Sequence, residues 1–414
     1  MQATSTWKLA LDKGSRPGAI KMTENFMIQS EMVRSLVGGK QGLKDVWDEE
    51  YGTEMPKIKK TFKNRSKVFE IDNANNGFNS TSDLNVLAKR YGDEVSGTSD
   101  RDVYNATVEA FDMMYAQTFT DEDRMNINDF DSSNTIANWI VQSEKKVPKY
   151  FGLNLADQIW NGSAKSGDST RGSVTNPDLG ARDGAIGIST IVGTDELYGL
   201  STSSVERWKG QTYDGGAALF DISEASQQTI SGLLTATGKI PILLSIFEKI
   251  LEDMEGDNYT IWVHPRVWTY LIRPMWEDTY LPSTSGDAKR QGFKDQIGYM
   301  PQNWPYIDSP TNGVIKTDRS RIFDKTTGKS QYVMPLNDIW FLNMDDFCLE
   351  AHQMKNMQTS KWYSDPTKHG TYIKTTESTF RFYNTNRWRQ ARYTLDSAVV
   401  AQLTGYTSNT TELG

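Results

Sequence analysis

Residues 335–391 decide how this chain folds, with PLNDIWFLNMDDFCLEAHQ at 335–353 and TYIKTTESTFRFYNTNRWRQA at 371–391. The apolar run at 339–342 lies between a proline and an asparagine, which predicts a short buried strand. The side chains of residues 372–383 alternate between two faces, which predicts a long strand with one packed and one polar face. One face carries Tyr372, Lys374, Thr376, Ser378, Phe380 and Phe382, and the other carries Glu377, Thr379 and Arg381. With no nucleophile beside a base and no ligand cluster, the stretch indicates structure rather than chemistry.

The composition favours a large protein with broad contact surfaces. A chain of 414 residues is long enough for two or three compact lobes. Its 12 Trp, 18 Tyr and 16 Phe belong to residue types that are favoured at protein interfaces, although polar enzymes can share this composition. The net charge of −8 argues against a protein whose main task is coating nucleic acid, so we expect any DNA contact to be local and weak.

The sequence gives little indication of a disulfide, a metal site or a membrane-spanning segment. Cys348 is the single cysteine, which excludes an intrachain disulfide, and His264, His352 and His369 are too far apart in sequence to indicate a zinc site. The first residues lack the pattern of a signal peptide, and no run of about 18 apolar residues would make a transmembrane helix. We therefore expect a protein of the reducing cytoplasm.

The first hundred residues predict thin, extended pieces. Residues 1–50 contain a short amphipathic piece at 24–37 but cannot make their own core, so we expect something to hold them, such as a neighbouring copy. Residues 56–69 read PKIKKTFKNRSKVF and predict a basic strand. The strand either contacts nucleic acid or an acidic partner, or its lysines oppose edge-to-edge aggregation, and we favour the second interpretation. Residues 104–119 predict a return strand after a polar excursion.

A long helix and a flexible loop are expected next. Asp131 and Ser132 suit a helix cap, and an apolar stripe follows at helical spacing. The stripe consists of Ile136, Trp139, Ile140, Val147, Phe151, Leu155 and Ile159, with Pro148 expected to kink the helix and Gly152 to soften it. Residues 161–187 are rich in Gly and Ser and predict a flexible loop that lacks the spacing of a phosphate-binding loop.

The second lobe is predicted to be more regular. Residues 223–237 predict a helix that ends at Gly238, and Pro241 opens a second helix that ends before Gly256. A buried strand at 258–263 and a short helix after His264 follow, with His264 acting as a turn and cap residue. The irregular stretch 274–311, which contains Trp304, is a candidate for contacts around an oligomer axis.

The order of these elements resembles the major capsid proteins of tailed double-stranded-DNA bacteriophages, which have the Hong Kong 97-like fold. The resemblance spans residues 50–400 and depends on short motifs. These are the strand ending IWFLN, the MDDF turn, a polar stretch with a Trp-Tyr pair, the long strand, the Asn-Arg-Trp-Arg at 386–389, the GL turn and Arg-Trp within 193–214, and the HP pair at 264–265.

The resemblance implies an α+β fold with five segments. They are an N-terminal arm at 1–50, an extended two-stranded loop (E-loop) at 51–120, a peripheral domain with a long spine helix and a flexible loop at 121–220, an axial domain at 221–335, and the C-terminal strands and tail of the peripheral domain at 336–414. The implied function is a non-enzymatic subunit that assembles through hexamers and pentamers into an icosahedral shell around double-stranded DNA. Assembly would take place in the host cytoplasm, and the product would be a virion.

The implied partners are copies of the same chain and packaged DNA in weak, non-specific contact. A separate scaffolding protein, a portal and decoration proteins are further partners. No cofactor, metal site, catalytic residue or membrane is expected. The candidate subunit contacts are Lys57, Lys63, Arg65, Lys67, Phe111, Met113, Tyr115, Trp304, Arg387 and Trp388. The alternatives are an encapsulin-like compartment shell, an enzyme of unknown class, and a tail or sheath protein.

Some members of this family join their subunits by an isopeptide bond between a lysine and an asparagine, helped by a glutamate. This chain offers Lys57, Lys59, Lys60, Lys63 and Lys67 near the extended loop, and Asn384 and Asn386 near the end. The reaction needs a neutral, desolvated amine, whereas a cluster of lysines around Arg65 indicates a hydrated surface. We therefore predict a noncovalent shell.

Overall fold

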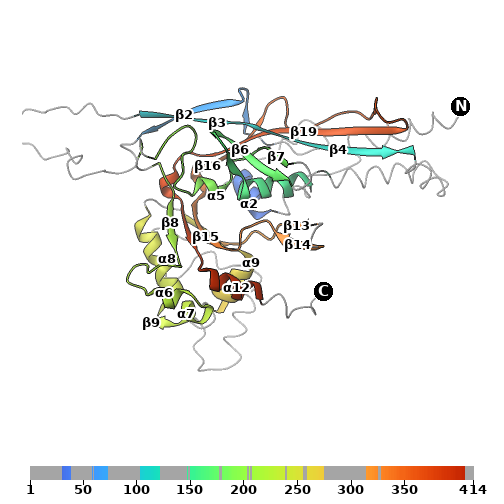
Figure 1. The fold of residues 1–414 in the computed structure, drawn as a ribbon. Coiled ribbons are helices and arrows are strands. Elements are labelled where there is room, and N and C mark those ends of the chain that lie inside the picture. Colours follow the sequence, from blue (N-terminus) through green and yellow to red (C-terminus); the bar gives the residue numbers. More distant parts are fainter. Residues whose placement is uncertain are drawn as a thin grey trace, which may run out of the picture.

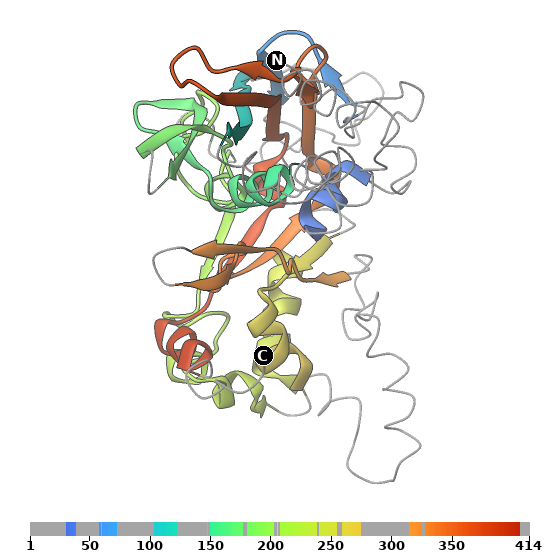
Figure 2. The same ribbon diagram turned by 90° about the vertical axis from the view of Figure 1, so that its right-hand side faces the viewer.

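A computed structural model describes residues 30–38, 58, 60–72, 103–121, 147, 150–176, 180–202, 205, 208–237, 240–254, 259–274, 314–324 and 328–405. The fold is a mixed α+β fold. Long strands form a layer at the top of Figure 1, a second sheet lies below it, and a helical lobe lies at the bottom. Figure 2 shows the second sheet between the upper and lower parts of the molecule.

Two hydrophobic cores lie on the two sides of this second sheet. The upper core includes Phe151, Trp160, Tyr198, Trp208, Trp340, Leu342, Phe380 and Phe382. The lower core includes Leu243, Ile246, Phe247, Ile250, Ile261, Leu271, Ile339, Phe341 and Tyr393.

The sheet between the cores has five strands, in the order β12 (Val314–Lys316), β11 (Tyr259–Trp262), β15 (Asp338–Asn343), β20 (Ala391–Thr394) and β8 (Gln211–Asp214). The central strand β15 sends Trp340 and Leu342 to the upper core and Phe341 to the lower one. A strand buried on both faces reads as a continuous apolar run. The predicted buried strands at 339–342 and 258–263 are therefore confirmed.

The upper layer is built around β19 (Thr371–Asn384), so the predicted long strand is confirmed. It pairs with β4 (Phe111–Thr120), β16 (Phe347–His352), β17 (Gln358–Thr359) and β18 (Tyr363–Ser364), while β1 (Thr61–Phe62) runs parallel to β16. The prediction of one polar face is wrong for the second half of β19, where residues 378–384 are all buried. Arg381 is buried because Glu350, Phe62 and the chain at Asn64 cover it.

The predicted return strand at 104–119 is two strands rather than one. Its first part, β3 (Val103–Glu109), pairs with β2 (Ser66–Asp72) in a two-stranded ribbon, which lies at the left of the upper layer in Figure 1. Its second part, β4, pairs with β19 along ten residues. The division falls at Ala110, whose N–H donates to the carbonyl of Arg65. Residues 111–120 thus belong to the large sheet and not to an extended loop.

The prediction of a flexible loop at 161–187 is also wrong. The strands β5 (Ser163–Lys165), β6 (Asp168–Asn176) and β7 (Gly180–Gly184) form an antiparallel sheet there. A Cβ atom on Gly172 would lie 2.2 Å from the carbonyl carbon of Ala185. The glycine at this position therefore permits close backbone packing, which a composition-based prediction cannot separate from flexibility.

Helical pieces close the upper core from below. Residues 150–161 are helical and bury Phe151, Leu155 and Ile159, as the stripe predicted, whereas the start of that predicted helix lies outside the described residues. Helix α2 (Glu31–Gly38) buries Met32 and Val33 in the same core. Residues 30–38 of the predicted N-terminal arm therefore pack on their own chain. The short α5 (Ile188–Ile191) buries Ile188 and Ile191 in the same core.

The lower lobe contains α8 (Ile242–Asp253), which confirms the helix predicted after Pro241. The helix predicted at 223–237 is shorter and broken into α6 (Glu224–Gln227) and α7 (Ile230–Leu234), followed by a hairpin of β9 (Ala236–Thr237) and β10 (Ile240–Pro241). The break has a local cause, because the Thr229 side chain accepts from the N–H of Gly232 and caps a new helix.

Short elements complete the lower lobe and the links to it. His264 caps α9 (Pro265–Val267) as predicted, since its side chain accepts from the N–H of Arg266, and the π-helix η5 (Trp268–Ile272) follows. The hairpin of β13 (Arg321–Asp324) and β14 (Lys329–Tyr332), the 3-10 turns η6 (Met344–Asp346) and η7 (Arg387–Arg389), and α12 (Ser397–Gly405) make up the rest.

Candidate assembly surfaces

The base of the β2–β3 ribbon is fixed by a cluster of charged side chains on the upper sheet. The Nζ of Lys67 lies 3.3 Å from Oε1 of Glu350 and also donates to the hydroxyl of Tyr383. Tyr383 donates to the same carboxylate at 3.0 Å, and the Nε of Arg381 donates to its other oxygen at 3.0 Å. The guanidinium of Arg381 lies 4.1 Å from the ring centroid of Phe62. These contacts join the ribbon to β16 and β19.

The carboxyl of Glu350 stays ionised within this cluster. Burial raises its pKa, but the hydrogen bond and charge of Arg381, with Tyr383 and Lys67, lower it more, so that the net pKa lies below its ordinary value. A half-buried carboxylate with charge-assisted hydrogen bonds is a directional anchor. The angle at which the ribbon leaves the sheet is therefore set by this cluster.

Alternate side chains of β2 point to opposite sides of the ribbon. Phe69 packs on Tyr198 and Tyr383, with ring centroids 5.9 and 5.5 Å away, and the N–H of Thr107 on β3 donates to the carbonyl of Tyr198. Val68 faces the other way and is 60% exposed. The ribbon thus has one side that is packed on its own chain and one open side that carries an apolar residue.

The basic residues predicted as contacts at the base of the ribbon lie in two different environments. Lys63 and Arg65 are exposed, and Arg65 forms a surface ion pair with Asp112 at 2.8 Å. Lys67 instead lies in the anchoring cluster. Lys57 lies outside the described residues, as does Trp304.

The aromatic and apolar contacts predicted on β4 point inward. Phe111 and Met113 are buried in the upper core, with the Phe111 ring 6.1 Å from that of Phe380, and Tyr115 stacks on Tyr150. The side chains of Phe111 and Met113 are therefore not available to another subunit, whereas Tyr115 is half-buried. The opposite face of the strand carries Met114, which is 66% exposed. Alternation along the sequence identified two faces, but only the pairing with β19 shows which one is covered.

Arg387 is fully buried and works inside the subunit. Its guanidinium donates to the carbonyls of Ile191 at 2.8 Å, Gly193 at 2.7 Å, Asp195 at 2.9 Å and Trp208 at 3.0 Å. Burial lowers its pKa to about 10, so it remains charged near neutral pH. Arg387 therefore fastens two loop segments to the C-terminal strands and is not available to a neighbour. Sequence reasoning missed this role because the buried carbonyls come from distant residues.

Trp388 is half-buried beside Arg387, and its carbonyl accepts from the Nε2 of Gln211 at 3.2 Å. Of the ten predicted contacts, Lys63 and Arg65 have side chains open at the surface. The subunit contact stays a prediction for these two residues, for the partly exposed Lys67, Tyr115 and Trp388, and for Lys57 and Trp304, which lie outside the described residues.

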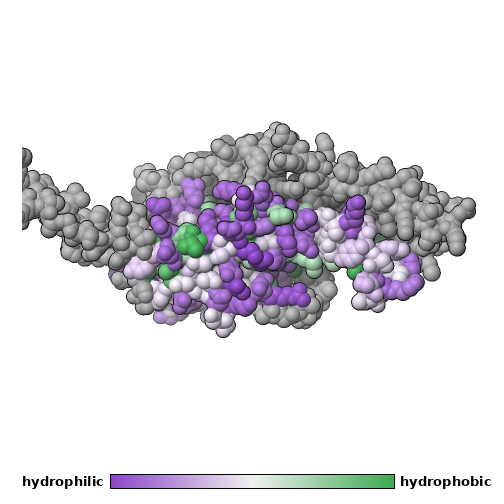
Figure 3. Space-filling model, turned by 90° about the horizontal axis from the view of Figure 1, so that it is seen from above, coloured by the Kyte–Doolittle hydropathy of each residue, from purple (hydrophilic) through white to green (hydrophobic). Residues whose placement is uncertain are grey.

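The described residues on the upper face are mainly hydrophilic, with separate hydrophobic spots (Figure 3). The exposed large apolar residues in the described part of the upper sheet and ribbon are Val68, Met114, Met354 and Tyr363, and Met354 is 79% exposed. Apolar residues scattered singly in this way are normal on a protein surface and do not mark one broad hydrophobic interface.

The described residues contain no obvious chemical centre. No three His, Cys, Asp or Glu side chains within them group closely enough to hold a metal ion. No helix in this part of the chain is both long and apolar enough to cross a membrane.

No protein-family model matches the chain, and no curated protein matches its sequence. Among solved structures, the chain is similar to the capsid asymmetric unit of cyanophage A-1(L), with 12% identity, a TM-score of 0.44, and coverage of 81% of this chain and 90% of the other. It is also similar to the capsid of a native GTA particle, with 10% identity, a TM-score of 0.41, and coverage of 81% and 87%. A third similar structure is the satellite phage P4 procapsid including the size determination protein, with 7% identity, a TM-score of 0.38, and coverage of 81% and 91%.

Proposed function

We propose that this chain is the major capsid protein of a tailed double-stranded-DNA phage, assembling through hexamers and pentamers of itself into an icosahedral shell. The observation that carries the proposal is the β2–β3 ribbon. An isolated two-stranded ribbon is marginally stable in water, yet this one is held at its base by charged side chains and leaves Val68 exposed on its open side. A ribbon oriented in this way is suited to cover an adjacent copy.

The sequence motifs and the order of the elements support the same function. The ribbon, the helix at 150–161, the α8–β11–α9 lobe and the long strand β19 follow one another in the order that the capsid resemblance implies. The central strands β11 and β15 of the five-stranded sheet are buried on both faces, which joins the two cores into one unit. Repeated copies of such a unit can tile a surface with defined edges.

The shell is proposed to be noncovalent. Lys67 is engaged by Glu350 and Tyr383 of its own chain, and Asn384 is fully buried, so neither suits a bond to a neighbouring copy. Denaturing gel electrophoresis of mature particles should give a single band near 46.8 kDa. A ladder of multimers that survives boiling and reductant would contradict this part of the proposal.

The main experiment is light scattering and negative-stain electron microscopy of the purified protein over a range of salt and pH. We expect closed shells or rings, because the open side of the ribbon is completed by another copy. A stable 46.8 kDa monomer under all conditions would overturn the proposal.

A deletion variant tests the ribbon separately. Replacing residues 73–99 with a short Gly-Ser turn should leave a folded subunit that assembles poorly, because β2 and β3 remain paired while the reach of the ribbon is lost. Circular dichroism checks the fold. If the deletion unfolds the chain, the excursion belongs to the subunit core and the ribbon is not an assembly element.

An encapsulin-like compartment is the second candidate, because it would share the fold and the self-assembly. Nuclease-protected double-stranded DNA in particles from producing cells favours the phage capsid. Particles that hold a protein cargo and no protected DNA favour the compartment.

A further inference from the structure

The five-stranded sheet has two edge strands, β12 and β8, that run in the same direction. Strand β12 is parallel to β11, strand β8 is parallel to β20, and both β11 and β20 are antiparallel to β15. The carboxyl ends of β12 and β8 therefore lie at the same end of the sheet, one at each edge. Figure 1 shows β8 on one side of the sheet and the β13–β14 hairpin, which follows β12, on the other.

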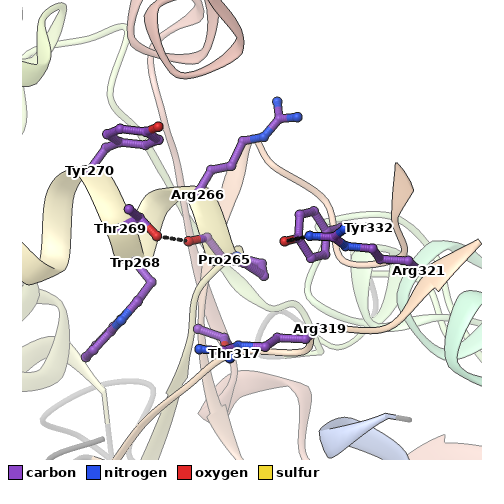
Figure 4. A pocket seen from close by; sticks show the side chains of 9 residues that line it. All are labelled: Pro265, Arg266, Trp268, Thr269, Tyr270, Thr317, Arg319, Arg321 and Tyr332. Atoms are coloured by element: carbon purple, nitrogen blue, oxygen red, sulfur yellow. Dashed lines mark hydrogen bonds between the residues drawn. The ribbon is translucent and has the colours of Figure 1, made fainter. Parts of the chain in front are cut away.

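The β12 edge is basic. Arg319 and Arg321 follow β12, Arg266 lies on α9, and all three line a cavity of about 480 Å³ (Figure 4). The guanidinium of Arg321 lies 4.2 Å from the ring centroid of Tyr332. Among the described residues, no carboxylate forms an ion pair with these arginines.

The imidazole ring of His264, next to this cavity, adds no charge. His264 is buried against Tyr332, with ring centroids 4.9 Å apart. Burial, and then the charges of Arg266 and Arg321, lower its pKa to about 3, so it is neutral at pH 7. The positive charge at this edge therefore comes from the arginines.

The β8 edge is acidic. Asp214 ends β8, Asp396 follows β20, and both line an open groove of about 440 Å³. A Cβ atom on Gly216 would lie 3.2 Å from one oxygen of Asp214 and 3.4 Å from one of Asp396, so the two carboxylates flank one point. Each accepts a backbone N–H, from Gly216 and Ala398 respectively, and neither is paired with a cation in the described part of the chain.

We propose that these two edges bind each other between neighbouring copies, with Asp214 and Asp396 of one copy entering the arginine cavity of the next. The charges are complementary, they lie at the same end of the sheet, and they lie on opposite sides of it. A contact between two different surfaces of one chain is head-to-tail and closes into a ring when the rotation permits. Complementary charges of this kind set the register and suppress wrong pairings.

This inference rests on the proposed function and names the contact that orders copies around a ring. A second copy fits the cavity better than a nucleic acid does, because the chain carries a net charge of −8 and supplies the matching carboxylates itself. Binding of a phosphate group in the same cavity is the competing outcome.

The test uses two full-length double variants. The first is Arg319→Glu with Arg321→Glu, and the second is Asp214→Lys with Asp396→Lys. Each alone would bring like charges together, so we expect ring or shell formation to fall by at least ~10-fold, measured by light scattering at 0.1 M salt. Mixed in equal amounts, the two variants should assemble again, because each reversed edge meets an oppositely charged edge. The mixed rings alternate, so rings with an even number of copies should dominate in native mass spectrometry.

Controls separate this inference from the proposed function. Wild-type protein that does not assemble overturns the proposed function itself. Wild-type protein that assembles, together with double variants that assemble equally well, overturns only the edge contact. If the mixed variants do not assemble although circular dichroism shows that both are folded, the edge contact is also overturned.

Arg319→Lys with Arg321→Lys keeps the charge and should still form rings. If Arg319→Glu with Arg321→Glu assembles normally but loses binding of a short DNA duplex in fluorescence anisotropy, the cavity binds phosphate and the proposal is wrong.

Discussion

The two cores on either side of the five-stranded sheet are built differently. The buried charged residues in the described part of the chain, Asp318, Lys374, Arg381 and Arg387, belong to the upper region. The lower core packs the apolar face of α8 against β11 and β15, and its buried polar contact joins Gln227 and Tyr393. Both regions bury apolar side chains, and the upper one adds directional bonds from buried charged residues.

The difference follows from what each region must hold. A helix packed on a sheet satisfies its own backbone groups, so apolar area is sufficient to stabilise it. The upper region instead positions a ribbon, irregular loops and α2, whose backbone groups need partners from elsewhere. Asp318, for example, accepts from Ser30 at 2.7 Å and from the indole of Trp160 at 3.2 Å. Charged side chains in this region fix the positions of the ribbon, the loops and α2.

The largest effect is expected from Arg387→Met, which removes the charge but keeps much of the apolar bulk. The carbonyls of Ile191, Gly193, Asp195 and Trp208 would lose a partner, and buried unsatisfied groups are costly. We expect a loss of about 3–5 kcal/mol in the free energy of unfolding, measured with denaturant. A change below about 1 kcal/mol would show that the upper core does not depend on directional bonds.

An intermediate effect is expected from Glu350→Gln at the ribbon base. The neutral amide leaves Arg381 and Lys67 without their carboxylate, which should cost about 1–3 kcal/mol at pH 7. Because the pKa of Glu350 is lowered in the folded state, its contribution is present above its ordinary value of 4.5 and is lost as the pH falls. The difference in the free energy of unfolding between wild type and variant should therefore shrink as the pH falls below 4.5. A difference that stays constant with pH would contradict the role of the charge.

A smaller effect is expected from Phe247→Leu in the lower core. Phe247 packs edge-to-face on Phe341 with ring centroids 5.3 Å apart and makes no polar contact there. Apolar substitutions of similar volume usually cost less than about 1.5 kcal/mol. Thermal unfolding of this variant beside Arg387→Met tests the comparison, and equal losses from both would erase the distinction between the cores.

The smallest effect concerns Asp346 in the turn between β15 and β16. Burial raises its pKa to about 6, against the opposing charge of Arg389. The folded state therefore favours the protonated acid. The loss of folding stability caused by ionising this buried carboxyl is absent below pH 3.8 and complete above about pH 6. Asp346→Asn should be more stable than wild type by about 1 kcal/mol at pH 7, and equal to it near pH 4. A variant that is less stable at pH 7 would show that the pair with Arg389 outweighs the cost of burial.

Elements with a strong local pattern could be predicted from the sequence, and contacts between distant residues could not. The apolar run at 339–342, the helix after Pro241 and the His264 cap each carry their own signal. The three strands within 163–184 do not, because glycines needed for close packing have the composition of a flexible loop. The same limit applies to the candidate site. The alternation at Phe111 and Met113 shows two faces, and only pairing with β19, far along the chain, decides that these residues point inward.

A cryo-electron microscopy reconstruction of the particles formed by the wild-type chain tests the central claim most directly. The account predicts closed shells in which the β2–β3 ribbon of each subunit lies over an adjacent copy, with Val68 at the contact. Particles in which each ribbon folds back on its own subunit and touches no neighbour would contradict it.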